Sequence, residues 1–195
     1  MANSDTPFGF KPVRKIGAQP NSGGVNRYYI GTGDSNNIFI GDPVDDSGTG
    51  DTKGVPGVVR ATAGSGGYVR GVVVGIENNT SDNLSRTYRP LSTAAYVLVA
   101  DDPDAEFEVQ EDSVGNALDE TVMGSNIDFI IGSGNTTTGI SATEIDSSSA
   151  DTTNTLQCRV LGLVQREDNA IGTNAKWLVR FNLHRARYTT GLSEA

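Results

Sequence analysis

Several residue types that support common chemistries are scarce in this chain. It contains one cysteine, Cys158, and one histidine, His184. A single cysteine excludes an intramolecular disulfide and a zinc site built from several thiolates. Because imidazole and thiolate are the usual ligands of transition metals, these counts also disfavour such a metal site and most histidine-based catalysis. A Cys–His nucleophile is disfavoured as well, since Cys158 lies in a strand-like stretch where free cysteines usually belong to the core.

Long apolar runs are also missing. No stretch approaches the roughly 18 to 20 apolar residues that a membrane helix needs, and the opening MANSDTPFGF lacks the basic-then-apolar pattern of a signal peptide. These absences predict a protein that is made in the cytosol and does not contact a membrane. The net charge of -9 argues against nucleic acid as a partner, because phosphate contacts require clustered Lys and Arg.

Charge is unevenly distributed along the 195 residues. Residues 1–30 carry four cations and one acid, and residues 159–195 carry six cations and three acids. Between them, residues 91–158 contain no Lys or Arg, while thirteen acids fall within 101–151. Two basic ends around an acidic middle predict either that the ends lie across the acidic region or that they contact an acidic partner.

The first 24 residues have three prolines, four glycines and no regular apolar period. This pattern predicts an extended N-terminal arm over 1–24, followed by a single β domain over 25–195. The arm carries the apolar residues Phe8 and Phe10, so we expect it to dock, either on its own domain or on a partner.

The rest of the chain predicts an all-β fold, an antiparallel β-sandwich or barrel with long polar loops. Of the 24 glycines in the whole chain, those after residue 24 separate short stretches rich in β-branched and aromatic residues, and no long helical pattern occurs. Nine strands are predicted, over 25–30, 37–40, 55–60, 68–76, 95–100, 106–110, 127–131, 156–165 and 176–183.

Alternation assigns faces to two of these strands. In 106–110 (EFEVQ), Phe107 and Val109 point to the core, so the opposite side is predicted to be an exposed row of carboxylates. In 176–183 (KWLVRFNL), Trp177 and Phe181 share the core face with the residues that alternate with them.

Two long polar segments, 45–53 and 133–155, are predicted to be solvated loops, with edge strands as the alternative. The first imitates the start of a calcium loop, but Pro56 stands where such a loop needs its bidentate carboxylate, so no metal site is predicted. One short helix is predicted within 113–117.

No stretch identifies a catalytic constellation. The acids of 101–108 are expected to form a solvated turn and strand face rather than a cation site. Carboxylate pairs carry no information in a chain with 24 acids. We therefore expect no catalytic residues, no cofactor and no enzymatic activity.

Several stretches of the chain form a recognisable set. They are Phe8-Gly9-Phe10-Lys11-Pro12-Val13, Tyr28-Tyr29-Ile30, Ile40-Gly41-Asp42-Pro43-Val44, Tyr88-Arg89-Pro90, residues 95–113 (AYVLVADDPDAEFEVQEDS) and residues 160–184 (VLGLVQREDNAIGTNAKWLVRFNLH). These stretches resemble the capsid decoration, or cement, proteins of short-tailed double-stranded DNA bacteriophages. The resemblance covers nearly the whole chain but includes no catalytic signature.

The resemblance implies an accessory virion protein, assembled in the host cytoplasm. Such proteins bind the outer surface of the expanded head, bridge neighbouring major capsid proteins and stabilise the shell. They are usually oligomers on local symmetry axes, most often trimers, with a dimer as the second option. Their partners would then be the major capsid protein and other copies of the same chain.

Aromatic and basic residues near both ends are the predicted capsid contacts, because such residues dominate interface energetics. They are Phe8, Phe10, Lys11, Arg14, Lys15, Arg185, Arg187 and Tyr188. The alternative is that these cations neutralise the acidic middle within the chain or the oligomer. Two other functions remain open, a virion-surface β module that binds host glycans and a hydrolase on a β scaffold. The few aromatics in the loops weigh against the glycan module.

Overall fold

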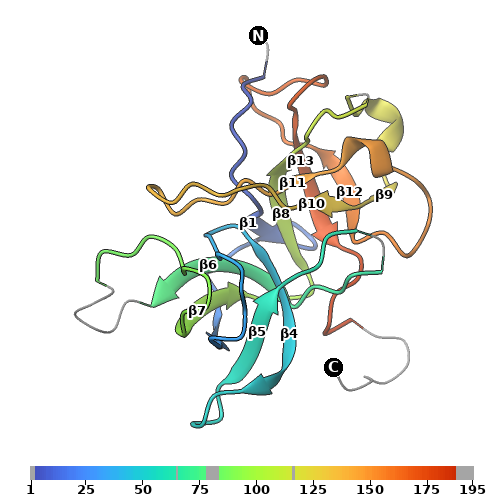
Figure 1. Ribbon diagram of the computed structural model, residues 1–195. Coiled ribbons are helices and arrows are strands. Elements are labelled where there is room, and N and C mark those ends of the chain that lie inside the picture. Colours follow the sequence, from blue (N-terminus) through green and yellow to red (C-terminus); the bar gives the residue numbers. More distant parts are fainter. Residues whose placement is uncertain (1–2, 65, 78–83, 116, 188–195) are drawn as a thin grey trace.

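The computed structural model describes residues 3–64, 66–77, 84–115 and 117–187, and nearly all of its regular structure is β-strand (Figure 1). The predicted all-β class with antiparallel sheets is confirmed. One half is a closed five-stranded barrel in the order β3-β5-β4-β6-β7. Its strands are β3 (Asn26–Ile30), β4 (Pro43–Gly50), β5 (Pro56–Arg60), β6 (Gly71–Glu77) and β7 (Ala95–Ala100).

The other half is a six-stranded sheet in the order β2-β1-β8-β13-β12-β9. Its strands are β1 (Lys11–Lys15), β2 (Gln19–Pro20), β8 (Ala105–Gln110), β9 (Asn126–Ile127), β12 (Cys158–Leu163) and β13 (Lys176–Phe181). A separate pair is made by β10 (Phe129–Ile130) and β11 (Glu144–Ile145), and two short 3-10 helices cover Glu120–Val122 and Ser147–Ser149. The barrel is thus inserted in the chain between β2 and β8.

Each half has its own apolar core, and strand β6 contributes to both. Val72 packs into the core of the six-stranded sheet, whereas Val73 packs into the barrel. Successive side chains of a strand point to opposite faces, so one strand can serve two cores. The two halves are therefore joined by shared packing as well as by the chain.

The N-terminal segment is extended, as predicted, and docks on its own chain. Phe10 is 1% exposed, and its ring centroid lies 5.0 Å from that of Phe181 and 5.8 Å from that of Phe129. The segment enters through Gly9 (φ 73°), where an added Cβ would lie 2.5 Å from the carbonyl oxygen of Gly41. Beyond Phe10, β1 pairs with β8. Residues 11–15 therefore belong to the main sheet rather than to a separate arm.

Other expectations from the sequence need correction. The predicted strand 37–40 contributes only isolated bridges, at Ile38 and Ile40. The predicted loop 45–53 is largely strand β4, and the predicted loop 133–155 contains β11. The described residues of 113–117 form no helix. Within the described ranges, no helix is long and apolar enough to span a membrane.

Candidate functional site

The outer side of the six-stranded sheet gathers cations from four separate parts of the chain. In β12 and β13 they alternate with core residues, while those of β1 lie opposite the glutamates of β8. We call this surface the basic sheet face; its cations are Lys11, Arg14, Arg159, Arg166, Lys176 and Arg180, and its acids are Glu106 and Glu108.

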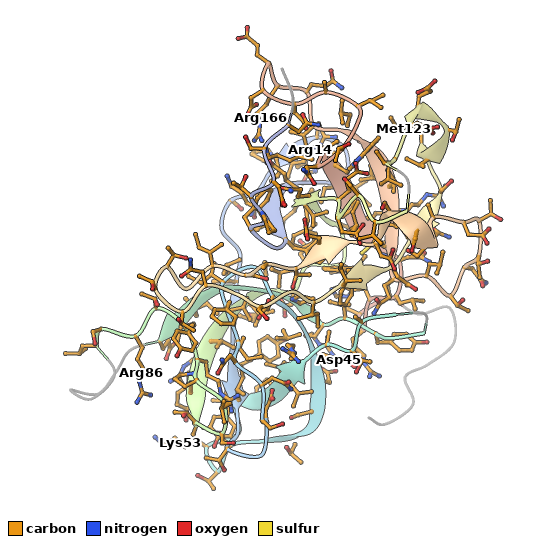
Figure 2. All side chains as sticks on the ribbon, turned by 45° about the horizontal axis from the view of Figure 1, so that its top comes forward. Arg14, Asp45, Lys53, Arg86, Met123 and Arg166 are labelled. Atoms are coloured by element: carbon orange, nitrogen blue, oxygen red, sulfur yellow. The ribbon has the colours of Figure 1, made fainter. Side chains whose placement is uncertain are left out.

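Both glutamates of this face are covered by arginines. Arg14 Nε lies 2.5 Å from Glu106 Oε2, and Arg166 Nη2 lies 2.7 Å from Glu108 Oε1. Figure 2 labels both arginines, on the half of the molecule that holds the sheet. Glu106 and Glu108 are only 7% and 5% exposed. The predicted exposed row of carboxylates is therefore wrong, because guanidinium groups lie over it.

Four cations of the basic sheet face have no acidic partner. In the described part of the chain, no carboxylate oxygen lies within 4.0 Å of the charged groups of Lys11, Arg159, Lys176 or Arg180. Asp168 also pairs with Arg166, at 3.2 Å, so six cations stand against three carboxylates and the surface is locally positive on a protein of net charge -9. Such a surface attracts an acidic partner.

An apolar groove of about 610 Å³ borders this face, where the N-terminal segment passes between the barrel and the sheet. Ile40 and Ile140, which line it, are 38% and 42% exposed. Phe8 and Pro12 line it as well, and Lys11, Glu108, Arg166 and Lys176 are its charged residues. Exposed apolar surface with a charged rim is typical of a protein-interaction site.

The predicted capsid contacts are divided among different environments. Phe8 lines the apolar groove, and Lys11 and Arg14 lie on the basic sheet face. Phe10 also lines the groove, but it is only 1% exposed and belongs to the core, which corrects its expected role as a surface anchor. Its ring is drawn inward because burial among three phenylalanines removes it from water.

The remaining predicted contacts form ion pairs within the chain. Lys15 Nζ lies 2.6 Å from Asp102, Arg185 Nε lies 2.6 Å from Asp45, and Arg187 pairs with Asp104. Tyr188 lies outside the described residues. Lys15 and Arg187 thus neutralise the acidic middle, the alternative left open by the sequence, whereas Arg185 pairs with an acid outside that region.

Sequence reasoning missed Arg159, Arg166, Lys176 and Arg180. A usable signal existed for two of them, because Lys176 and Arg180 alternate with the predicted core residues of the same strand. Their meeting with Lys11 and Arg14 depends on β8 lying between β1 and β13. That order joins strands far apart in the sequence and has no local signature.

The only cysteine and histidine are both buried. Burial raises the pKa of the Cys158 thiol far above its ordinary value, so the thiol stays protonated at neutral pH. Burial, and then the charge of Arg70, lower the pKa of His184 to about 4, which leaves its imidazole neutral. Across the described ranges, no group of three or more His, Cys, Asp or Glu side chains is arranged to hold a metal ion.

Glu144 is a half-buried carboxyl group among other acids. Burial raises its pKa to about 7, with further contributions from Asp5, Asp112 and Glu111. Its Oε1 atom is buried without a hydrogen-bond partner. The folded chain therefore favours the neutral acid.

Glu144 should contribute a fall in stability as the pH rises from about 4.5 to about 7, because its carboxyl group binds more protons in the folded than in the unfolded state in that interval. The buried His184, whose pKa is lowered to about 4, contributes a change of the opposite sign, so the Glu144 contribution is seen by comparison with a variant. Glu144→Gln should remove the Glu144 contribution and raise the free energy of unfolding at pH 8 by about 1 kcal/mol, a value reduced for the partial exposure of the side chain. Urea denaturation at pH 5 and pH 8 measures both the pH dependence of the free energy of unfolding and its increase in the variant at pH 8. Glu120→Gln, at an exposed site, is the control, and identical pH profiles for wild type and Glu144→Gln would contradict the prediction.

No protein-family model, no curated protein and no solved structure matches this chain. Its function is therefore argued from its residues and their arrangement.

Proposed function

We propose that this protein is a structural component of a phage virion that binds the outer surface of the head, bridges neighbouring major capsid proteins and stabilises the expanded shell. The observation that carries the proposal is the basic sheet face with its adjoining apolar groove. A positively charged face beside an apolar groove can bind an acidic protein surface stably, through ion pairs and through burial of apolar side chains. The resemblance of the sequence to capsid decoration proteins supplies the identity of that surface.

Two further features support a binding role over a catalytic one. The buried thiol and the neutral, buried imidazole are poor starting points for nucleophilic or acid–base chemistry. The high content of strand gives a rigid scaffold, which binds with little loss of conformational freedom. A protein that binds only the assembled shell stabilises that shell by the free energy of binding.

The proposal is tested by co-sedimenting the purified protein with expanded heads that lack it. We expect saturable binding at a symmetric stoichiometry and an increase in the temperature at which DNA is released. Binding should weaken as salt is added, because exposed charges are screened. The homotrimer implied by the resemblance is checked on the same sample by a mass measurement in solution.

A charge-reversal variant locates the contact. Lys11→Glu combined with Arg180→Glu breaks no ion pair of the described chain and should weaken head binding about tenfold or more, the equivalent of about 1.4 kcal/mol. Lys53→Glu, which reverses a single exposed cation in a barrel loop, is the control for a charge change away from the sheet and should bind as wild type does. Equal loss in both variants would assign binding to net charge alone.

Two outcomes would contradict the proposed function. Failure of the wild-type protein to bind heads would remove the capsid as a partner. Binding without a rise in the release temperature would favour the alternative, a virion-surface module that adheres to host glycans, and a glycan array would then be the next measurement.

A further inference from the structure

Two arginines of the basic sheet face stand directly opposite each other. Arg159 in β12 and Arg180 in β13 are cross-strand partners in the antiparallel ladder. Like charges at opposed positions destabilise a sheet. In the described part of the chain, neither guanidinium has an ion pair or a side-chain hydrogen bond. The arrangement therefore lacks an explanation within the chain itself.

The acids nearest to this pair are already engaged. Glu106 accepts a hydrogen bond from Arg14 Nε at 2.5 Å, and Asp104 is paired with Arg187. The pKa of Arg180 is lowered first by burial and then by the charges of Arg187 and Arg159. Positive charge thus exceeds negative charge locally, and an added carboxylate would relieve the repulsion.

A small groove of about 320 Å³ lies beside the pair. Val13, Leu161 and Leu178 contribute its apolar lining, and Arg14 lies at its side. Leu161 is two residues from Arg159 in β12, and Leu178 is two residues from Arg180 in β13. Val13 is 43% exposed, so the groove is open to solvent.

We propose that Arg159 and Arg180 form a carboxylate-binding site, and that the groove beside them takes an apolar side chain from the same partner segment. The partner is an extended acidic stretch of protein in which Asp or Glu stands two positions from Leu, Ile, Val or Phe. In an extended chain such residues point to the same side and lie about 7 Å apart, which is the relation of Leu178 and Arg180 in β13; Leu161 stands at the bulge of β12, two residues after Arg159.

Guanidinium groups suit this ligand because they bind carboxylates through two parallel hydrogen bonds. Phosphate would satisfy the same arginines, but a nucleic-acid backbone carries no apolar side chain for the groove. The inference rests on the proposed function only in naming the capsid as the source of the segment. The site itself is defined by its ligand chemistry and can be tested without heads.

The probe is a fluorescent synthetic peptide with the repeat Leu-Ser-Asp-Ser, in which each aspartate stands two positions from a leucine, and its binding to the full chain is measured by anisotropy. Arg159→Gln combined with Arg180→Gln should weaken peptide binding at least tenfold, because both bidentate contacts are lost. Arg159→Lys combined with Arg180→Lys keeps the charge without the planar fork and should weaken it several-fold. Lys53→Gln should leave it unchanged.

The thermal midpoint of the same variants gives a second readout. Removal of the opposed charges should raise the midpoint of the Gln double variant, whereas a purely structural role of the arginines predicts a fall and would overturn the site. Unchanged peptide affinity in the Gln double variant would also overturn it. If a single-stranded oligonucleotide of equal charge bound more strongly than the peptide, the ligand of the site would be nucleic acid rather than an acidic segment of protein. Peptide binding without head binding would uphold the site and reject the proposed function.

Discussion

Replacing Phe10 with alanine should lower the free energy of unfolding by about 3 to 5 kcal/mol, the usual cost of truncating a fully buried phenylalanine. Its ring packs against those of Phe107, Phe129 and Phe181, from three different parts of the sheet half. No polar group or water can fill the resulting cavity favourably, since the surrounding residues are apolar. Urea denaturation followed by the fluorescence of Trp177, in the same core, measures the loss.

Phe8→Ala is the matched control, because it makes the same change two residues earlier at a partly exposed site. We expect it to cost about 1 kcal/mol or less. Equal effects of the two variants would contradict the assignment of Phe10 to the core.

Deleting residues 1–24 would remove both Phe10 and strand β1 and so disturb the fold. Loss of head binding in that deletion would therefore not show that the deleted residues contact the capsid.

Replacing Arg89 with methionine should lower the free energy of unfolding by a similar amount, about 3 to 5 kcal/mol. Arg89 is fully buried, and its guanidinium donates hydrogen bonds to the carbonyl oxygens of Gly31, Asn36 and Thr93 at 2.6 to 2.7 Å. The Gly31 carbonyl keeps a hydrogen bond from Asp34 N, but each buried carbonyl left without a donor costs about 1 to 3 kcal/mol. The side chain of Asp34, 3.9 Å away, would also lose its cation.

Arg89→Lys should lower the free energy of unfolding by less than Arg89→Met, because one ammonium can still donate to part of this carbonyl set.

The two variants also test whether the barrel and the sheet unfold together. Trp177 reports the sheet half, while Tyr28 and Tyr96 report the barrel. Since β6 contributes to both cores, both signals should shift to the same urea concentration. A shift confined to the tyrosine signal would show that the halves unfold independently.

The largest gap between sequence and structure concerns strand β1. Lys11, Arg14 and Lys15 give it a polar composition, and Pro12 argues against a central strand because proline cannot donate to a ladder. The structure tolerates Pro12 because β2 pairs only with Arg14 and Lys15, which leaves the other side of Pro12 without a neighbouring strand. Pairing with β8 and burial of Phe10 stabilise β1 as a strand although its own residues have a low strand propensity.

Strand β4 was missed for a related reason. Its sequence, PVDDSGTG, is typical of a solvated loop. In the fold, Asp45 is paired with Arg185, and Asp46 is paired with Arg70. These partners come from distant positions, so the charge that marks a loop in the sequence is compensated only after folding.

By itself the sequence determined the all-β class, the core faces of β8 and β13 and the asymmetry of charge along the chain. These follow from local composition and from alternation, which depend only on neighbouring residues. Tertiary structure alone decided which cations face the acidic middle and which meet on the basic sheet face. Strand order and register are set by contacts between distant residues, so the opposition of Arg159 and Arg180 exists only once β12 and β13 have paired.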